Sequence, residues 1–209
     1  MINTANAADP YSGKTLCMLG DSYVRNHKCQ PSESWHAKLA ALLGMNYVNW
    51  GRNGSSIAFD RTAEGFGPAM TQRYLEMPDT ADYVIVIAGH NDADYLTKHG
   101  GWDKFSAGLE ELCTGLQKKY PAAKIGFVTP WGVDRPYFRE VTAEIHRVCN
   151  KYNIPVLDTT SPAIIDVNNP DFRTMYFQRA NDTAHLNNSG HNLMIGIGQR
   201  FLDRLTNGD

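Results

Sequence analysis

Short apolar runs alternate along the chain with longer segments in which apolar residues recur at helical spacing. The short runs predict five strands, at residues 15–19, 46–49, 83–88, 124–129 and 154–158. The first, third and fourth are apolar at almost every position, which is typical of strands buried on both faces of a parallel sheet. The alternation of strands and helices therefore predicts an α/β domain with helices on the faces of the sheet.

Apolar stripes at helical spacing predict helices at residues 34–43, 105–116, 141–152 and 193–205. For the first of these, Ser32 is the expected N-cap and Gly44 the C-terminal stop. The last contains Gly196 and Gly198, each of which costs about 1 kcal/mol of helix propensity relative to alanine. We therefore expect close packing of this helix on a neighbour to compensate.

Composition places the chain among single-domain globular proteins that act on small molecules. It has 209 residues, of which 42% are hydrophobic and 20% charged, and we expect an N-terminal extension at 1–14 and one domain at 15–209. The net charge of -2 gives no large positive field, so neither nucleic acid nor an anionic membrane is an expected partner. The sequence does not indicate an oligomeric state.

The apolar runs are far shorter than the roughly 20 residues needed to span a bilayer. Residues 1–14 lack the basic start and apolar core of a signal peptide, so the chain as given predicts a cytoplasmic protein, or a secreted one if a signal peptide has been removed. The cysteines, Cys17, Cys29, Cys113 and Cys149, show no CxxC spacing. This pattern favours buried free thiols, leaves a disulfide open and argues against a zinc site.

Ligands of open parallel sheets bind beyond the carboxyl ends of the strands, so candidate chemistry belongs in the loops that follow the strands. The first loop opens with Gly20-Asp21-Ser22, which makes Ser22 a candidate nucleophile. All three residue types are common in turns, so the triplet alone is weak support.

The loops after the second and third strands contain candidate donors for a developing negative charge. Gly54 can turn its backbone N–H toward a ligand; Gly51 is the alternative, and the spacing from the strand favours Gly54. In the next loop the side-chain amide of Asn91 can stabilise an oxyanion, and such a donor contributes about 3 to 4 kcal/mol. The neighbouring His90 is a weaker candidate for a general base than His185.

A fourth segment, just before the last predicted helix, contains Asp182 and His185. Residues three apart across one turn lie within about 7 Å at their Cα atoms, so Asp182 can orient the His185 ring. Judged singly, the two are an ordinary turn residue and an ordinary histidine. Together with the three matching loops, they form a candidate acid/base pair.

In these four blocks, taken in order, the sequence resembles the SGNH (GDSL-type) hydrolases, a family of esterases, lipases and acylhydrolases. The resemblance implies a flavodoxin-like three-layer α/β/α fold with a five-stranded parallel sheet in the order 2-1-3-4-5. It also implies site roles: Ser22 as nucleophile, Asp182 and His185 as its acid/base pair, and an oxyanion hole made by the backbone N–H groups of Ser22 and Gly54 and the Asn91 amide. Tyr23 stands where the family has leucine, which bears on acyl-chain preference.

The resulting hypothesis is a serine ester hydrolase that works through an acyl-serine intermediate and needs no metal or organic cofactor. The polar and aromatic loop residues Arg25, Asn53, His90, Trp131 and Arg135 predict a wet, open site, and Tyr23 is a further expected substrate contact. Such a site favours a small-molecule ester with a short acyl group, such as acetate on a carbohydrate.

Alternatives to this hypothesis are a lysophospholipase or thioesterase, and a non-catalytic ligand-binding module. A flavodoxin-like nucleotide binder is disfavoured because no phosphate-binding glycine pattern follows the first strand.

Overall fold

The computed structural model describes residues 10–208. Its centre is a sheet of five parallel strands: β1 (Thr15–Gly20), β2 (Asn46–Gly51), β3 (Tyr83–Ile87), β4 (Lys124–Val128) and β5 (Val156–Leu157). Their order is β2-β1-β3-β4-β5, which confirms the expected topology. Each strand begins close to its predicted position, except β5.

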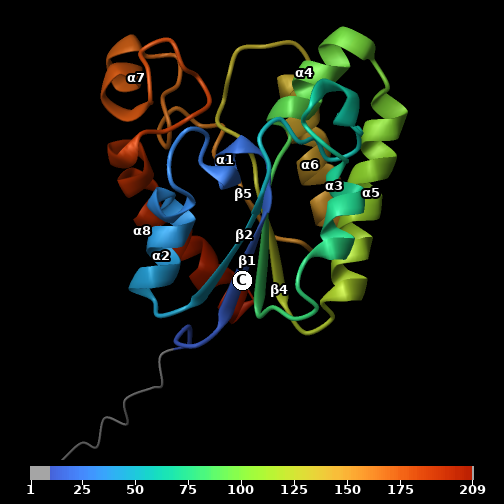
Figure 1. Ribbon diagram of the computed structural model, residues 1–209, viewed down its shortest axis with the longest axis vertical. Coiled ribbons are helices and arrows are strands. Elements are labelled where there is room, and N and C mark those ends of the chain that lie inside the picture. Colours follow the sequence, from blue (N-terminus) through green and yellow to red (C-terminus); the bar gives the residue numbers. More distant parts are fainter. Residues whose placement is uncertain (1–9, 209) are drawn as a thin grey trace, which may run out of the picture.

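Helices cover both faces of the sheet, so the fold has three layers (Figure 1). One outer layer contains α2, α7 and α8, and the other contains α3, α4, α5 and α6. Their bounds are α1 (Ser22–Arg25), α2 (Trp35–Leu42), α3 (Met70–Arg73), α4 (His90–His99), α5 (Trp102–Lys119), α6 (Phe138–Lys151), α7 (Pro170–Tyr176) and α8 (Asn188–Asn207). Short 3₁₀ turns lie at Pro31–Glu33, Thr62–Glu64 and Tyr74–Glu76.

The predicted apolar stripes account for most of the helix packing. In α5, Phe105, Leu109, Leu112 and Leu116 are all buried against the sheet, as expected. In α2 the stripe is narrower than predicted, because Leu42 is 67% exposed. The N-cap prediction at Ser32 is wrong: this residue lies in the 3₁₀ turn before α2, whereas Gly44 does end that segment, in the left-handed region with φ 64°.

The two glycines of α8 differ in what surrounds them. A Cβ on Gly198 would lie 2.3 Å from Cζ3 of the buried Trp35, so α2 and α8 approach closely at this point. A Cβ on Gly196 would meet only the end of the Arg200 side chain, at 3.8 Å. The expected compensation through close packing is therefore confirmed for Gly198 and wrong for Gly196.

The fifth strand is shorter than predicted because the first two predicted residues do not donate hydrogen bonds to the neighbouring strand. The N–H of Ile154 bonds the carbonyl of Cys149 at the end of α6, and Pro155 has no N–H to donate. The carbonyl of Pro155 still accepts from Phe127 of β4 at 3.0 Å. Pairing as a strand is thus limited to Val156 and Leu157.

The folded unit begins before the predicted boundary at residue 15. Tyr11 is buried, and its hydroxyl donates to Asp203 of α8 at 2.5 Å; residues 1–9 of the expected extension lie outside the described residues. Between residues 10 and 208 no helix has the length and apolarity to cross a bilayer. The cysteines are free thiols, of which Cys29 alone is only half-buried.

Candidate active site

The loops of the candidate site leave the sheet side by side because the register aligns the ends of three neighbouring strands. Gly20, the last residue of β1, pairs with Gly51 of β2 and with Ile87 of β3. Ser22 follows two residues after Gly20, and Asn91 four residues after Ile87. Three chain segments distant in sequence are thereby brought to the same edge of the sheet.

Ser22 is the first residue of α1, a single helical turn that follows β1 directly. Asp21 caps this turn, since its Oδ1 accepts the N–H of Tyr23 at 2.9 Å. Asn26 ends it in the left-handed region, with φ 60°. Complete burial raises the pKa of Asp21 to about 7, although the hydrogen bond from Tyr23 opposes the rise. The turn holds Ser22 at the sheet edge with 8% of its surface exposed.

The Ser22 hydroxyl, the His185 ring and the Asp182 carboxylate form a continuous chain. Ser22 Oγ lies 3.0 Å from His185 Nε2, and His185 Nδ1 lies 3.0 Å from Asp182 Oδ2. Asp182 Oδ1 also accepts the backbone N–H groups of Ala184 and His185, at 2.8 and 2.9 Å. Burial favours a higher pKa for Asp182, but these hydrogen bonds outweigh it and hold the pKa at about 2. The carboxylate is ionised and fixed in place.

The glycine loop after β2 is held in one conformation. Gly54 has φ 74°, and a Cβ there would lie 2.1 Å from the Phe66 ring. The buried Arg61 donates to the Gly54 carbonyl at 3.2 Å. Gly51, by contrast, is a strand residue whose N–H already donates to Asn49 Oδ1 at 2.9 Å. Of the two glycines, Gly54 is the one whose conformation requires glycine.

Asn91 links the serine turn to the glycine loop. It lies in the first turn of α4, and its Nδ2 donates to Asp21 Oδ2 at 3.0 Å and to the Ser55 carbonyl at 3.2 Å. The segment beginning at His90 is thus helical, whereas its sequence predicted a loop. The helix start directs the Asn91 amide to the space between two other loops.

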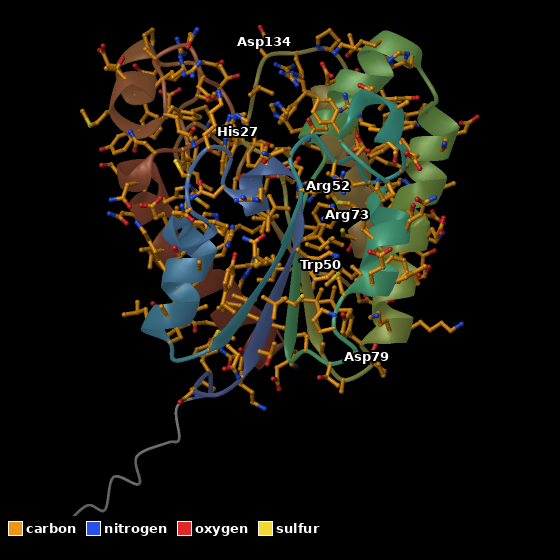
Figure 2. All side chains as sticks on the ribbon, viewed as in Figure 1. His27, Trp50, Arg52, Arg73, Asp79 and Asp134 are labelled. Carbon is orange, nitrogen blue, oxygen red and sulfur yellow. The ribbon has the colours of Figure 1, made fainter. Side chains whose placement is uncertain are left out.

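A buried arginine that the motifs did not reveal, Arg73, donates hydrogen bonds to the strand ends beneath the site. Arg73 donates to the carbonyls of Gly20 and Trp50, at 3.2 and 2.5 Å, and to Ser55 Oγ at 2.9 Å. Figure 2 shows Arg73 and Trp50 beside the strands, nearer the middle of the molecule than His27. Burial lowers the pKa of Arg73 to about 10, which leaves it charged at neutral pH. Its charge and hydrogen bonds fix the ends of β1 and β2.

Three candidate substrate contacts are buried against one another instead of lining an open surface. The Tyr23 ring lies 4.4 Å from that of Trp131, and its hydroxyl lies 3.1 Å from His90 Nδ1. Arg135 donates to His90 Nε2 at 3.0 Å, and Trp131 donates to the Ala184 carbonyl at 2.8 Å. Burial, and then the charge of Arg135, lower the pKa of His90 to about 3. The expectation that His90 and Trp131 are open loop residues is wrong.

The other predicted contacts differ in their surroundings. Arg25 is exposed and Asn53 is half-buried next to Gly54. In the part of the chain that the structure describes, no group of three or more histidine, cysteine, aspartate or glutamate residues is arranged to hold a metal ion.

A comparison with models of protein families gives a match that covers most of the chain. A family model described as the GDSL-like lipase/acylhydrolase family matches residues 18–193. This span includes the Ser22 turn, the Gly54 loop and the Asp182–His185 segment. A comparison with curated proteins gives no match.

Solved structures of similar fold cover most of the chain. A structural-genomics target from Lactobacillus plantarum is 28% identical, with a TM-score of 0.76 over 92% of this chain and 97% of that one. Axe2, an acetylxylan esterase from Geobacillus stearothermophilus, is 21% identical, with a TM-score of 0.66 over 91% and 94%. A carbohydrate esterase family 2 enzyme from Corynascus thermopiles is 17% identical, with a TM-score of 0.59 over 73% and 59%. At such identities the two esterases establish a shared fold.

Proposed function

Because the chain belongs to the GDSL-like lipase/acylhydrolase family, and is thus a GDSL-type esterase, we propose that Ser22 is its nucleophile, with His185 as general base and Asp182 as the carboxylate that orients it. The observation that carries the proposal is the chain of two 3.0 Å contacts from Ser22 through His185 to Asp182. In this geometry His185 Nε2 accepts the hydroxyl proton as Ser22 Oγ attacks the ester carbonyl. Asp182 then stabilises the imidazolium.

The oxyanion of the tetrahedral intermediate is bound by the backbone N–H groups of Ser22 and Gly54 and by the Asn91 amide. Support comes from the Gly54 conformation and from the position of the Asn91 amide between the two neighbouring loops. Both N–H groups of this amide donate within the protein, to Asp21 and Ser55, so an oxyanion would take one of them from its present acceptor. The two backbone donors are preorganised and cost no rearrangement when charge develops, and loss of one such donor lowers kcat by about 10²–10³-fold. As the intermediate collapses, the His185 imidazolium gives its proton to the leaving alcohol oxygen, and an acyl-serine ester remains. Water, deprotonated by His185, hydrolyses that ester.

The proposed substrate is an ester of a short acyl group, such as acetate, with a polar alcohol such as a sugar. A cavity of about 1130 Å³ lies between the loops after β4 and β5 and the start of α6. Ser22, His185 and Asp182 do not line it, but Arg135 in its wall contacts His90, which in turn contacts Tyr23. Polar side chains including Asp134, Arg135, Thr160 and Asn168 line the cavity. The same fold in an acetylxylan esterase and in a carbohydrate esterase supports this substrate class.

Hydrolysis of p-nitrophenyl acetate by wild type and Ser22→Ala tests the nucleophile. Loss of the hydroxyl is expected to lower kcat by about 10⁴-fold or more, while the exposed Ser32→Ala control keeps wild-type turnover. Equal turnover by Ser22→Ala and wild type would refute the assignment.

The substrate class is tested separately, with p-nitrophenyl esters of two to twelve carbons and with acetylated xylose oligomers. We expect the highest kcat/KM at acetate and release of acetate from the oligomers. An optimum at long chains would instead support a lysophospholipase-type or thioesterase-type activity. A tightly bound but unhydrolysed ester would support the ligand-binding module.

A further inference from the structure

The ring of His27, a residue outside all the sequence motifs, lies against the face of the His185 ring. The ring centroids are 4.4 Å apart and the planes are inclined by 31°. Asp182 and Ser22 each contact one ring nitrogen of His185, at 3.0 Å. Contacts at two ring edges leave the imidazole free to tilt about the line between them. A face contact removes that freedom.

The backbone around His27 is held in an unusual conformation. Asn26 and Lys28, on either side, both have φ 60°, in the left-handed region that residues other than glycine seldom adopt. The Asn26 side chain is held at both ends: its Nδ2 donates to the Gln30 carbonyl at 2.7 Å, and its Oδ1 lies 3.0 Å from His191 Nε2 of α8. These contacts stabilise the strained turn and hold His27 next to His185.

One glutamine connects the loop of His27 to the loop of His185. Gln178 Nε2 donates to the His27 carbonyl at 2.7 Å, and its backbone N–H donates to the His185 carbonyl at 2.9 Å. Figure 2 places His27 at the end of the molecule where the strands end, between the α1 segment and the C-terminal loops. The spacing of the two rings is therefore set by the backbone as well as by their own contact.

The polar edge of His27 is turned to the glycine loop. His27 Nδ1 and Asn53 Oδ1 are both buried, and neither has a hydrogen bond of ordinary geometry among the described residues. Burial lowers the pKa of His27, and nearby His185 and Lys28 lower it further, whereas Asp182 and the Asn53 side chain oppose the shift. His27 is thus a neutral ring at neutral pH, in contact with the residue that precedes Gly54.

We propose that His27 is a positioning residue: its ring fixes the plane of the His185 imidazole between Asp182 and Ser22 and covers its face as it takes the Ser22 proton. A neutral aromatic face stabilises the resulting cation and excludes water from it. This inference rests on the proposed role of His185 as general base. It adds an element that neither the family motifs nor the triad contains.

The test compares His27→Ala, which removes the ring, with His27→Phe, which keeps an aromatic face but has no ring nitrogen. We expect kcat for p-nitrophenyl acetate to fall about tenfold in His27→Ala with KM nearly unchanged, because a small misplacement of a catalytic group affects the chemical step. His27→Phe is expected to stay within about threefold of wild type. Rescue by the aromatic variant distinguishes positioning from general loss of structure.

His99→Ala is the matched control, because the His99 ring, at the end of α4, also packs against an aromatic ring, that of Tyr95, with the ring centroids 4.5 Å apart and the planes inclined by 42°. It is expected to leave kcat unchanged. Thermal unfolding checks folding of each variant, and His27→Leu, which has no aromatic face, replaces His27→Ala if the latter does not fold. It should then show the tenfold loss.

Wild-type kcat in a folded His27→Ala variant, or equal losses in the alanine and phenylalanine variants, would overturn the proposal. Ser22→Ala is measured in parallel: if it retains turnover, the proposed function itself fails. If Ser22→Ala is inactive while His27→Ala is not, only the role of His27 fails.

Discussion

Gly196 and Gly198 occupy the same helix, yet replacing each with alanine should have opposite effects on stability. Both lie within α8, so each substitution gains about 1 kcal/mol of helix propensity. Gly196 is exposed, and its new methyl group makes only an ordinary contact with Arg200 at 3.8 Å. We expect Gly196→Ala to stabilise the protein by about 1 kcal/mol.

At Gly198 the gain is outweighed by overpacking. A Cβ would lie 2.3 and 2.7 Å from two carbons of the Trp35 ring and 3.2 Å from Leu39 Cδ2. The Trp35 ring is rigid and 2% exposed, so relief requires α2 and α8 to separate. Overpacking costs about 1–3 kcal/mol, and a rigid obstacle favours the upper end of this range. Gly198→Ala should therefore be less stable than wild type by about 1–2 kcal/mol.

Urea unfolding of both variants measures the difference directly. The two free energies of unfolding should differ by about 2–3 kcal/mol at an unchanged m-value, and each 1 kcal/mol shifts Tm by about 2–4 °C in a domain of this size. Equal stability of Gly198→Ala and Gly196→Ala would refute the close approach of the two helices. A fall in m-value would instead indicate that the compactness of the folded or unfolded state had changed.

Two further predictions concern the site. Gly54→Ala should lower kcat/KM for p-nitrophenyl acetate at least about tenfold, because its Cβ would meet the Phe66 ring and its φ is 74°. Gly13→Ala is the control: Gly13 has φ 76° but open space around it, so this variant has the backbone strain without the clash and should keep its activity. The pKa of Asp182, held at about 2 against an ordinary 3.8, means that its stabilising contribution is present above pH 4 and is lost as the pH falls toward 2. In urea unfolding, the free energy of unfolding of wild type should therefore exceed that of Asp182→Asn at pH 6, and the difference should disappear as the pH falls to 2. A difference that stays constant across this range would contradict the low pKa.

Hydrophobic pattern was sufficient to predict the sheet and the long helices because burial against a two-sided sheet imposes it. The helix α4 was not predicted, since only four of its ten residues are buried and these include His90 and Asp92. The polar residues of this helix are explained by its position, because its first turn forms part of the candidate site. The length of strand β5 was overestimated because Pro155, which has no N–H to donate, lies among the apolar residues 154–157.

The residues of the candidate site also differ in how far the sequence could predict them. Residues in motifs could be found from their order along the chain, whereas Arg73, Arg61 and His27 have no local signature. Each acts through long-range contacts, such as the bonds from Arg73 to the ends of two strands. Trp131 was misjudged as an open contact because an aromatic ring with one polar atom suits either a wet rim or a buried cluster.

The serine and histidine that meet in the site are separated by 163 positions along the chain. Every strand of the sheet lies between them in sequence, apart from β1. During synthesis the Ser22 turn emerges early, and the proposed site stays incomplete until the segment before α8 has docked. Recovery of ester hydrolysis on refolding would therefore report when Ser22 and His185 come together, and a fragment ending before residue 182 would contain the proposed nucleophile without its proposed base.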